Sequence, residues 1–193
     1  MSLPGQLVVV SGPSGVGKST VVGEVLGRFG GRLRLSVSAT TRPARPGELD
    51  GVEYYFLSAE QFEQRRSQGE FLECAEVFGQ GHWYGTLRSE VSPFLAKGKW
   101  VLLEVDVDGA QDVLGKFPEA VTIFIRPATL AELERRLRRR GTESAEAIER
   151  RLGVANGELA LAHRYQYNIV NDTVGVAVDE FCQVLRDQGL SND

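Results

Sequence analysis

The sequence predicts an α/β fold with a parallel sheet at its core and helices on both faces of that sheet. Short apolar runs rich in β-branched residues recur along the chain, as is typical of strands buried in parallel sheets. Stretches with helical patterns lie between these runs and after the last of them, and this alternation implies a sheet covered on both faces. A glycine-rich segment, residues 12–19, joins the first apolar run to the first helical stretch.

Each core element follows from a local pattern. Four buried strands are expected, at residues 7–10, 100–105, 121–125 and 167–170. Five helices are expected, at residues 19–28, 108–116, 130–140, 145–161 and 176–187. Thr129 and Glu132 form a capping box, which predicts that one of these helices begins directly after Thr129.

Residues 37–97 interrupt the alternation and predict a small α+β insertion on the main sheet. A short aromatic strand is expected at 53–56, and a further strand at 71–77. Between them, Ser58 and Gln61 form a second capping box and predict the start of a helix.

A second irregular stretch, residues 136–156, is punctuated by Gly141 and Thr142 and predicts a mobile lid. The whole chain, residues 1–193, is expected to form one domain, because its length is ordinary for a single core. The core segments of that domain are expected at 1–36, 98–135 and 157–193.

The composition excludes several classes of protein. With 42% hydrophobic and 25% charged residues, the chain is neither disordered nor fibrous. A net charge of −4 disfavours a general nucleic-acid binder, and the absence of a long apolar run predicts no membrane partner. Only Cys74, Cys182, His82 and His163 could form a zinc or disulfide framework, and they are too few and too scattered to suggest one. A cytoplasmic location is therefore expected.

The glycine-rich segment reads GPSGVGKS and matches the phosphate-binding pattern G-x4-G-K-[ST], between a predicted strand and a predicted helix. Glycines let backbone N–H groups converge on phosphate oxygens, and the helix N-terminus adds partial positive charge. Lys18 is expected to reach the β- and γ-phosphates of a nucleoside triphosphate, and Ser19 to bind Mg²⁺. The residues expected to bind the phosphates are Gly12, Pro13, Ser14, Gly15, Val16, Gly17, Lys18 and Ser19.

This loop alone does not name the reaction, because GTPases, motors and small-molecule kinases share it. Residues 106–109 read DVDG and fit the D-x-x-G pattern of GTPase switches. The chain lacks the N-K-x-D element with which GTPases bind guanine. A kinase for a small acceptor, with the insertion at 37–97 as its acceptor site, is the better interpretation.

Several further segments resemble those of guanylate kinases. They are SVSATTRPARPGE at 36–48, GVEY at 51–54, FLE at 71–73, YGT at 84–86, RGTE at 140–143 and IVND at 169–172. The resemblance runs in order from about Leu7 to Asp187. It implies the reaction ATP + GMP → ADP + GDP, with dGMP as a further acceptor, in purine nucleotide metabolism and GMP recycling. It also identifies residues 37–97 as a GMP-binding region.

The resemblance assigns the GMP phosphate to Arg42, Arg45, Tyr54 and Tyr84. Two guanidinium groups offer bidentate hydrogen bonds that lysines could not match. A GMP phosphate is already an anionic nucleophile, so positioning and positive charge are expected to supply most of the catalysis.

For guanine, the resemblance assigns Glu73, with the hydroxyls of Ser38 and Thr86 near the base. A carboxylate accepts the adjacent N1–H and N2–H₂ donors of guanine as a pair, whereas adenine would leave it unpaired. Glu104 and Asp106 lie two residues apart and are expected on one face of a strand end, for contact with hydrated Mg²⁺ or with the acceptor. The family commonly has Asp at position 104, and residues 74–83 form a stretch two residues longer than the family pattern.

A dense arginine cluster precedes the predicted hinge at Gly141. Arg136 and Arg140 share a helical face, and the resemblance assigns both, with Arg151, to the triphosphate. It also places Asn171 near the adenine of ATP. The residues expected to take part in catalysis are Lys18, Arg42, Arg136, Arg140 and Arg151.

Two alternatives remain open at this point. One is a related kinase for another phosphorylated small molecule, such as a ribose bisphosphate; Tyr54, Glu73 and Thr86 argue against it. The other is a guanylate-kinase-like interaction module without catalysis, which the intact Lys18 and Ser19 argue against. Both a monomer and a homo-oligomer are compatible with the sequence.

Overall fold

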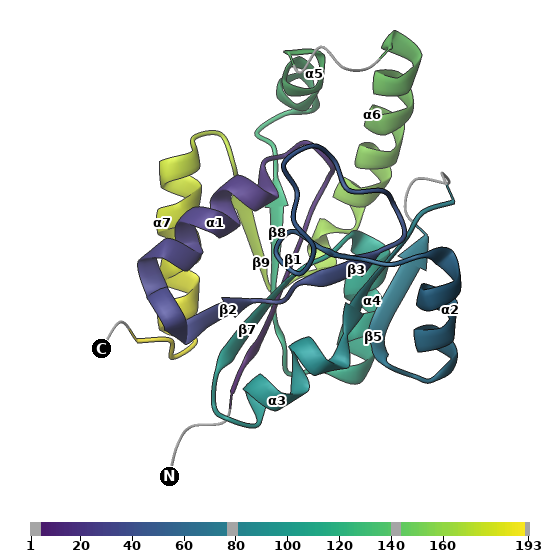
Figure 1. Cartoon of the computed structure of the whole chain (residues 1–193). Coiled ribbons are helices and arrows are strands. Elements are labelled where there is room, and N and C mark those ends of the chain that lie inside the picture. The colour runs from purple at the N-terminus through teal and green to yellow at the C-terminus, as the bar shows by residue number, and fades with distance from the viewer. Residues whose placement is uncertain (1–4, 77–80, 140–143, 192–193) are drawn as a thin grey trace.

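The computed structural model describes residues 5–76, 81–139 and 144–191 (Figure 1). Its core is a five-stranded sheet in the order β2-β7-β1-β8-β9, and every neighbouring pair is parallel. The strands are β1 (Leu7–Ser11), β2 (Leu33–Leu35), β7 (Trp100–Glu104), β8 (Val121–Arg126) and β9 (Tyr167–Val170). The four predicted core strands are thus confirmed. The edge strand β2 was not predicted, because three residues carry no readable periodicity.

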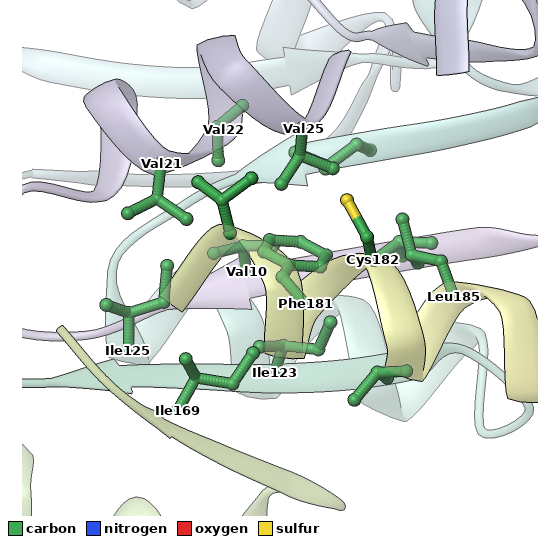
Figure 2. Close-up of a cluster of buried hydrophobic side chains, with 14 of the residues drawn as sticks. Val10, Val21, Val22, Val25, Ile123, Ile125, Ile169, Phe181, Cys182 and Leu185 are labelled. Carbon is green, nitrogen blue, oxygen red and sulfur yellow. The ribbon is translucent and has the colours of Figure 1, made fainter. Parts of the chain in front are cut away.

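Helices cover both faces of this sheet, as the sequence predicts. The helices α1 (Lys18–Phe29) and α7 (Val174–Asp187) cover one face, and α4 (Val107–Lys116) with α3 (Ser92–Leu95) lies on the other. Successive side chains of β1 alternate between the two layers: Val8 and Val10 pack with α1 and α7, whereas Leu7 and Val9 pack with α4. Figure 2 shows Val10 and Ile123 of the sheet against Phe181 of α7 in the first layer.

The insertion forms a second sheet in the order β4-β3-β6-β5. Its elements are β3 (Ser38–Thr40), β4 (Tyr55–Phe56), α2 (Ala59–Ser67), β5 (Phe71–Glu76) and β6 (Trp83–Leu87). The capping box of Ser58 and Gln61 begins α2 as predicted. Strand β4 is shorter than the predicted 53–56, and β3 and β6 were not predicted as strands. Residues 77–80, at the end of the predicted strand 71–77, lie outside the described residues.

The β5 edge of the second sheet rests on the core. Leu72 of β5 is fully buried in the layer beneath α4, together with Val107 and Ala110. Lys116, at the end of α4, donates a hydrogen bond to the carbonyl oxygen of Leu72. The second sheet is therefore attached to the core along one edge strand as well as through its two connections to the chain.

Two helices, α5 (Leu130–Arg139) and α6 (Ala145–Ala160), rise above the carboxyl ends of the core strands (Figure 1). They pack on each other through Leu133, Leu137, Ile148 and Ala155. The hydroxyl of Thr129 accepts a hydrogen bond from the backbone N–H of Glu132 at 3.1 Å, so the predicted start of α5 is confirmed. The predicted hinge at Gly141 and Thr142 lies outside the described residues, as does Arg140.

Across the described ranges, no helix has the length and apolar character that crossing a bilayer requires.

We expect Phe181→Ala to lower the free energy of unfolding by about 3–5 kcal/mol, since it leaves a cavity between α7 and the sheet. Phe181 is among the largest fully buried side chains. Urea denaturation measures the change. Val176→Ala on the same helix is the matched control, because Val176 is 62% exposed and its truncation should cost less than about 0.5 kcal/mol. Equal losses in the two variants would contradict this description of the core.

Candidate active site

In the glycine-rich segment at residues 12–19, residues 12–17 form the loop that links β1 to α1, and Lys18 and Ser19 begin that helix. The loop lies at the carboxyl end of the core sheet. Gly12 has φ 142°, and a Cβ there would lie 2.0 Å from the carbonyl oxygen of Ile125. Gly17 caps α1 with φ 94° and without a side-chain hydrogen bond to the helix. The first N–H groups of α1 therefore face the loop, and a helix start of this kind favours phosphate oxygens.

Lys18 is turned back into this loop. Its Nζ donates hydrogen bonds to the carbonyl oxygens of Gly12 and Pro13, the second at 3.2 Å. Burial lowers the pKa of the Lys18 ammonium, and the nearby carboxylates of Glu104 and Glu158 oppose that effect. A phosphate could take the place of the two carbonyl oxygens, and in exchange the ammonium would gain a full counter-charge.

Ser19 and Glu104 lie next to each other at the start of α1 and the end of β7. The Ser19 hydroxyl donates to Oε1 of Glu104 at 2.7 Å. Hydroxyl and carboxylate oxygens are ligands that Mg²⁺ prefers, and Mg²⁺ in kinases takes few protein ligands because phosphates and waters supply the rest. Within the described ranges, no group of three or more His, Cys, Asp or Glu residues could hold a metal by itself. This small set of donors fits a metal that arrives with a nucleotide.

The prediction that Glu104 and Asp106 share one strand face is wrong. Strand β7 ends at Glu104, and Asp106 is the N-cap of α4, where Oδ1 accepts the backbone N–H of Gly109 at 2.7 Å. An aspartate after a strand is a favourable helix cap, and α4 follows without a loop. Both carboxylates nevertheless face one cavity. Burial raises the pKa of Asp106.

That cavity, of ≈ 200 Å³, lies between the glycine-rich loop, the second sheet and α6. It brings together nine of the predicted site residues, from six separate parts of the sequence. They are Gly12, Ser14, Lys18, Ser38, Tyr54, Glu73, Tyr84, Glu104 and Asp106.

Three polar side chains form a row across the second sheet. Ser38 of β3 pairs with Thr86 of β6, and Thr86 pairs with Glu73 of β5. The buried Thr86 hydroxyl donates to Oε1 of Glu73 at 2.6 Å. Because residues opposite each other in neighbouring strands point to the same face, the row presents a carboxylate and a hydroxyl side by side.

The Glu73 carboxylate is held in a confined space. A Cβ added at Gly109 of α4 would lie 2.9 Å from Oε2 of Glu73, so the absence of a side chain there lets the carboxylate approach the helix. Burial raises the pKa of Glu73 to about 7, and the hydrogen bond from Thr86 opposes the rise. A carboxylate that is buried and has few donors is prepared to accept hydrogen bonds from a ligand.

Arg42 and Glu48 form the second charged part of the site. The guanidinium donates to both carboxylate oxygens of Glu48, at 2.6 and 2.7 Å. The pair lowers the pKa of Glu48 to about 2. The guanidinium also lies 4.9 Å from the centre of the Tyr54 ring, which is in edge contact with Tyr84. Arg45 is exposed, and its backbone N–H donates to Glu48 at 2.8 Å.

Residues of the predicted lid contact the glycine-rich loop directly. Arg151 of α6 donates to the hydroxyl of Ser14 at 2.6 Å. Arg136 of α5 donates to the carbonyl oxygens of Val16 and Asn171, at 3.1 and 2.8 Å. Asn171 is buried, and its Nδ2 donates to the same Val16 oxygen at 2.8 Å. Arg136 and Asn171 thus both hold the loop through the carbonyl oxygen of Val16, an arrangement that the sequence did not suggest.

Sequence reasoning missed two acidic residues of the site. Glu48 lies inside a recognised motif but was not assigned a partner. Glu158 of α6 lines the cavity, and burial raises its pKa to about 7 although Lys18 opposes the rise. The helical spacing of Arg151, Ala155 and Glu158 puts them on one face of α6, and this spacing could have identified Glu158.

Comparison with known proteins gives one consistent result. The guanylate kinase family model matches residues 4–188. A guanylate kinase of Rhodopirellula baltica is 54% identical over 186 residues, covering 96% of this chain and 89% of that protein. A guanylate kinase of Symbiobacterium thermophilum is 48% identical over 181 residues, covering 94% and 84%. The crystal structure of guanylate kinase from Anaplasma phagocytophilum is similar with a TM-score of 0.80 at 34% identity, covering 97% of this chain and 88% of that chain.

The environment of Glu73 predicts an unusual titration. We expect the Glu73 carboxyl carbon, followed by ¹³C NMR, to titrate with a midpoint near pH 7, because burial raises its pKa to about 7. Thr86→Val should raise the midpoint further, since it removes a hydrogen bond to the charged form. Glu48 is the internal control, with a midpoint near pH 2 in both proteins. A Glu73 midpoint near 4.5, unchanged by Thr86→Val, would contradict the described site.

Proposed function

Because the chain belongs to the guanylate kinase family, which transfers the terminal phosphoryl group of ATP to GMP, we propose how the residues of the cavity divide this reaction among them. The row formed by the buried Glu73 and Thr86 and the half-buried Ser38 is the observation that carries the proposal. The guanine base binds against this row. Glu73 accepts hydrogen bonds from the N1–H and N2–H₂ groups of guanine. The hydroxyl of Ser38 or Thr86 forms a further hydrogen bond to the base beside Glu73.

The GMP phosphate binds to Arg42, Arg45, Tyr54 and Tyr84. Glu48 holds the Arg42 guanidinium in place through two hydrogen bonds, which fixes its orientation before the ligand arrives. Arg42 and Arg45 then supply two positive charges on the side of the phosphate away from ATP. Tyr54 and Tyr84 add phenolic O–H donors, and burial raises the pKa of Tyr54, which keeps it protonated.

The triphosphate binds in the glycine-rich loop at the start of α1. Lys18 exchanges its two carbonyl partners for phosphate oxygens, and Arg136, Arg140 and Arg151 approach from the lid. Asn171 lies close to this loop and is assigned to the adenine side. The γ-phosphate of ATP and the phosphate of GMP meet in line in the cavity. No general base is needed, because the GMP phosphate is already an anion.

A divalent metal accompanies ATP in such kinases, and we infer that it is Mg²⁺ held by Ser19 with Glu104 nearby. When bound, Mg²⁺ neutralises charge on the phosphates of ATP. Glu104, at the end of β7, and Asp106, at the N-cap of α4, face the same cavity. We assign them to hydrogen bonding with metal-bound water or with the acceptor.

We also propose which acceptors the enzyme phosphorylates and where in the cell it works. We assign no side chain to the ribose 2′-hydroxyl, and we infer that dGMP serves as a second acceptor. Residues 37–97 and the lid at 136–156 close around the two nucleotides and exclude water, since open transfer would hydrolyse ATP. The enzyme works in the cytoplasm, where ATP and GMP are available for purine nucleotide metabolism and GMP recycling.

A coupled assay of ADP release tests the proposed acceptor site. With ATP as donor, kcat/KM should be at least about 10⁴-fold higher for GMP than for AMP, because adenine leaves the buried Glu73 unpaired. Glu73→Gln should lower kcat/KM for GMP while leaving the KM for ATP within about twofold. Equal use of GMP, AMP and a ribose bisphosphate would refute the assigned pocket.

Gly109→Ala gives a more local test of the same pocket. Alanine favours helix α4 by about 1 kcal/mol, but its Cβ would meet the Glu73 carboxylate. We expect roughly tenfold lower kcat/KM for GMP, in line with one disturbed hydrogen bond. Gly115→Ala on the same helix is the matched control, because a Cβ there meets nothing within 4 Å. Loss of activity in both variants, or in neither, would contradict the close approach of Glu73 to Gly109.

A further inference from the structure

The side chain of Glu90 joins three parts of the chain that the proposed function does not use. Glu90 ends the short 3₁₀ turn Arg88–Glu90, between β6 and α3, and it is only 8% exposed. Its Oε2 accepts a hydrogen bond from Nη2 of Arg34 at 2.6 Å. Its Oε1 accepts from the hydroxyl of Tyr55 at 2.9 Å. The backbone N–H of Val37 also points to Oε2, at 3.5 Å.

These three partners lie on both sides of the junction between the two sheets. Arg34 belongs to β2, the edge strand of the core sheet, and its guanidinium stacks 4.0 Å above the Phe94 ring of α3. Val37 lies in the connection from β2 to β3, through which the chain enters the second sheet. Glu90 itself lies in the connection through which the chain returns to the core. Glu90 and Arg34 are therefore fixed to the core side of the junction.

Tyr55 is the partner on the second sheet. It lies on β4, and the strand order β4-β3-β6-β5 makes β4 and β5 the two opposite edges of that sheet. The β5 edge is already anchored to α4 through the buried Leu72 and the hydrogen bond from Lys116. The bond from Tyr55 to Glu90 ties the β4 edge as well. A sheet held along one edge can tilt about that edge, and a tie at the other edge limits this tilt without preventing closure around bound nucleotides.

We propose that Tyr55 and Glu90 form a positioning pair that sets the angle of the second sheet against the core and thereby the affinity for the phosphate acceptor. This inference rests on the proposed function, because it takes the row of Ser38, Thr86 and Glu73 as the acceptor site. Neither Tyr55 nor Glu90 lines the cavity, so the pair acts through the sheet and touches no substrate.

The pair acts on a population of conformations. The row of Glu73, Thr86 and Ser38 moves with the second sheet, whereas Glu104 and Asp106, which line the same cavity, belong to the core. If the β4 edge swings freely, these two halves of the acceptor site are correctly spaced in only a fraction of the molecules. The apparent dissociation constant for the acceptor then rises in inverse proportion to that fraction. The donor site lies on the core sheet and does not depend on the angle.

Tyr55→Phe tests the pair directly, because it removes only the hydroxyl and leaves the Arg34–Glu90 ion pair intact. We expect the dissociation constant for GMP, measured by calorimetry, to rise about five- to tenfold, as it would if the competent orientation fell to between about a fifth and a tenth of the molecules. The KM for ATP should stay within twofold. Tyr167→Phe is the matched control: its hydroxyl accepts from Gln188 at 2.8 Å, on the far side of the core, and neither constant should change.

A second variant separates the pair from general loss of stability. Glu90→Leu, which has no acceptor oxygen, should raise the dissociation constant for GMP at least as much, and adding Tyr55→Phe to it should raise that constant little further, because both variants remove the hydrogen bond from Tyr55. An unchanged GMP constant in Tyr55→Phe, or equal changes for GMP and ATP, would overturn the positioning pair while the wild-type enzyme still phosphorylates GMP. Absence of GMP kinase activity in the wild type would overturn the proposed function and this inference together.

Discussion

Burial of the Glu73 carboxylate between the second sheet and helix α4 is the constraint on which the rest of the site depends. A buried carboxylate is costly unless donors surround it, and here it has the Thr86 hydroxyl on one oxygen and the bare backbone of Gly109 near the other. The second sheet must therefore meet α4 closely, which Leu72 and Lys116 arrange at the same edge. Burial raises the pKa of Glu73 to about 7, so a ligand with two adjacent donors relieves a cost that the free protein bears.

The cationic side chains of the site differ from Glu73, because each of them already has oxygen partners in the free protein. Lys18, Arg136 and Arg151 already hold oxygen atoms of the glycine-rich loop or its neighbours, and Arg42 holds Glu48. These side chains do not have to be ordered from solvent when phosphates bind. In the free protein they are already held in position by hydrogen bonds to protein oxygens. Preorganised charge of this kind is what phosphoryl transfer requires, since the protein contributes position and electrostatics rather than covalent chemistry.

Local patterns predicted most of the fold, and tertiary pairing explains what they missed. The runs 7–10 and 121–125 are long and apolar enough to be read as buried strands, and the Ser58 capping box gave the start of α2. Strands β2 and β3 have three residues each and exist because neighbouring strands pair with them. For the same reason, family motifs identified Ser38, Thr86 and Glu73 as site residues, but they did not show that these residues lie opposite one another in paired strands. Asp106 was assigned to a strand, yet it caps α4, since the two residues between strand and helix carry no turn signal.

The most direct measurement is a crystal structure of the protein with GMP and a non-hydrolysable ATP analogue. We predict that both Glu73 carboxylate oxygens lie within about 3 Å of guanine N1 and N2, with the base against the Ser38–Thr86 row. We also predict that the Lys18 ammonium leaves the carbonyl oxygens of Gly12 and Pro13 for phosphate oxygens. A guanine base bound away from Glu73, with that carboxylate still bonded only to Thr86, would contradict the assigned site.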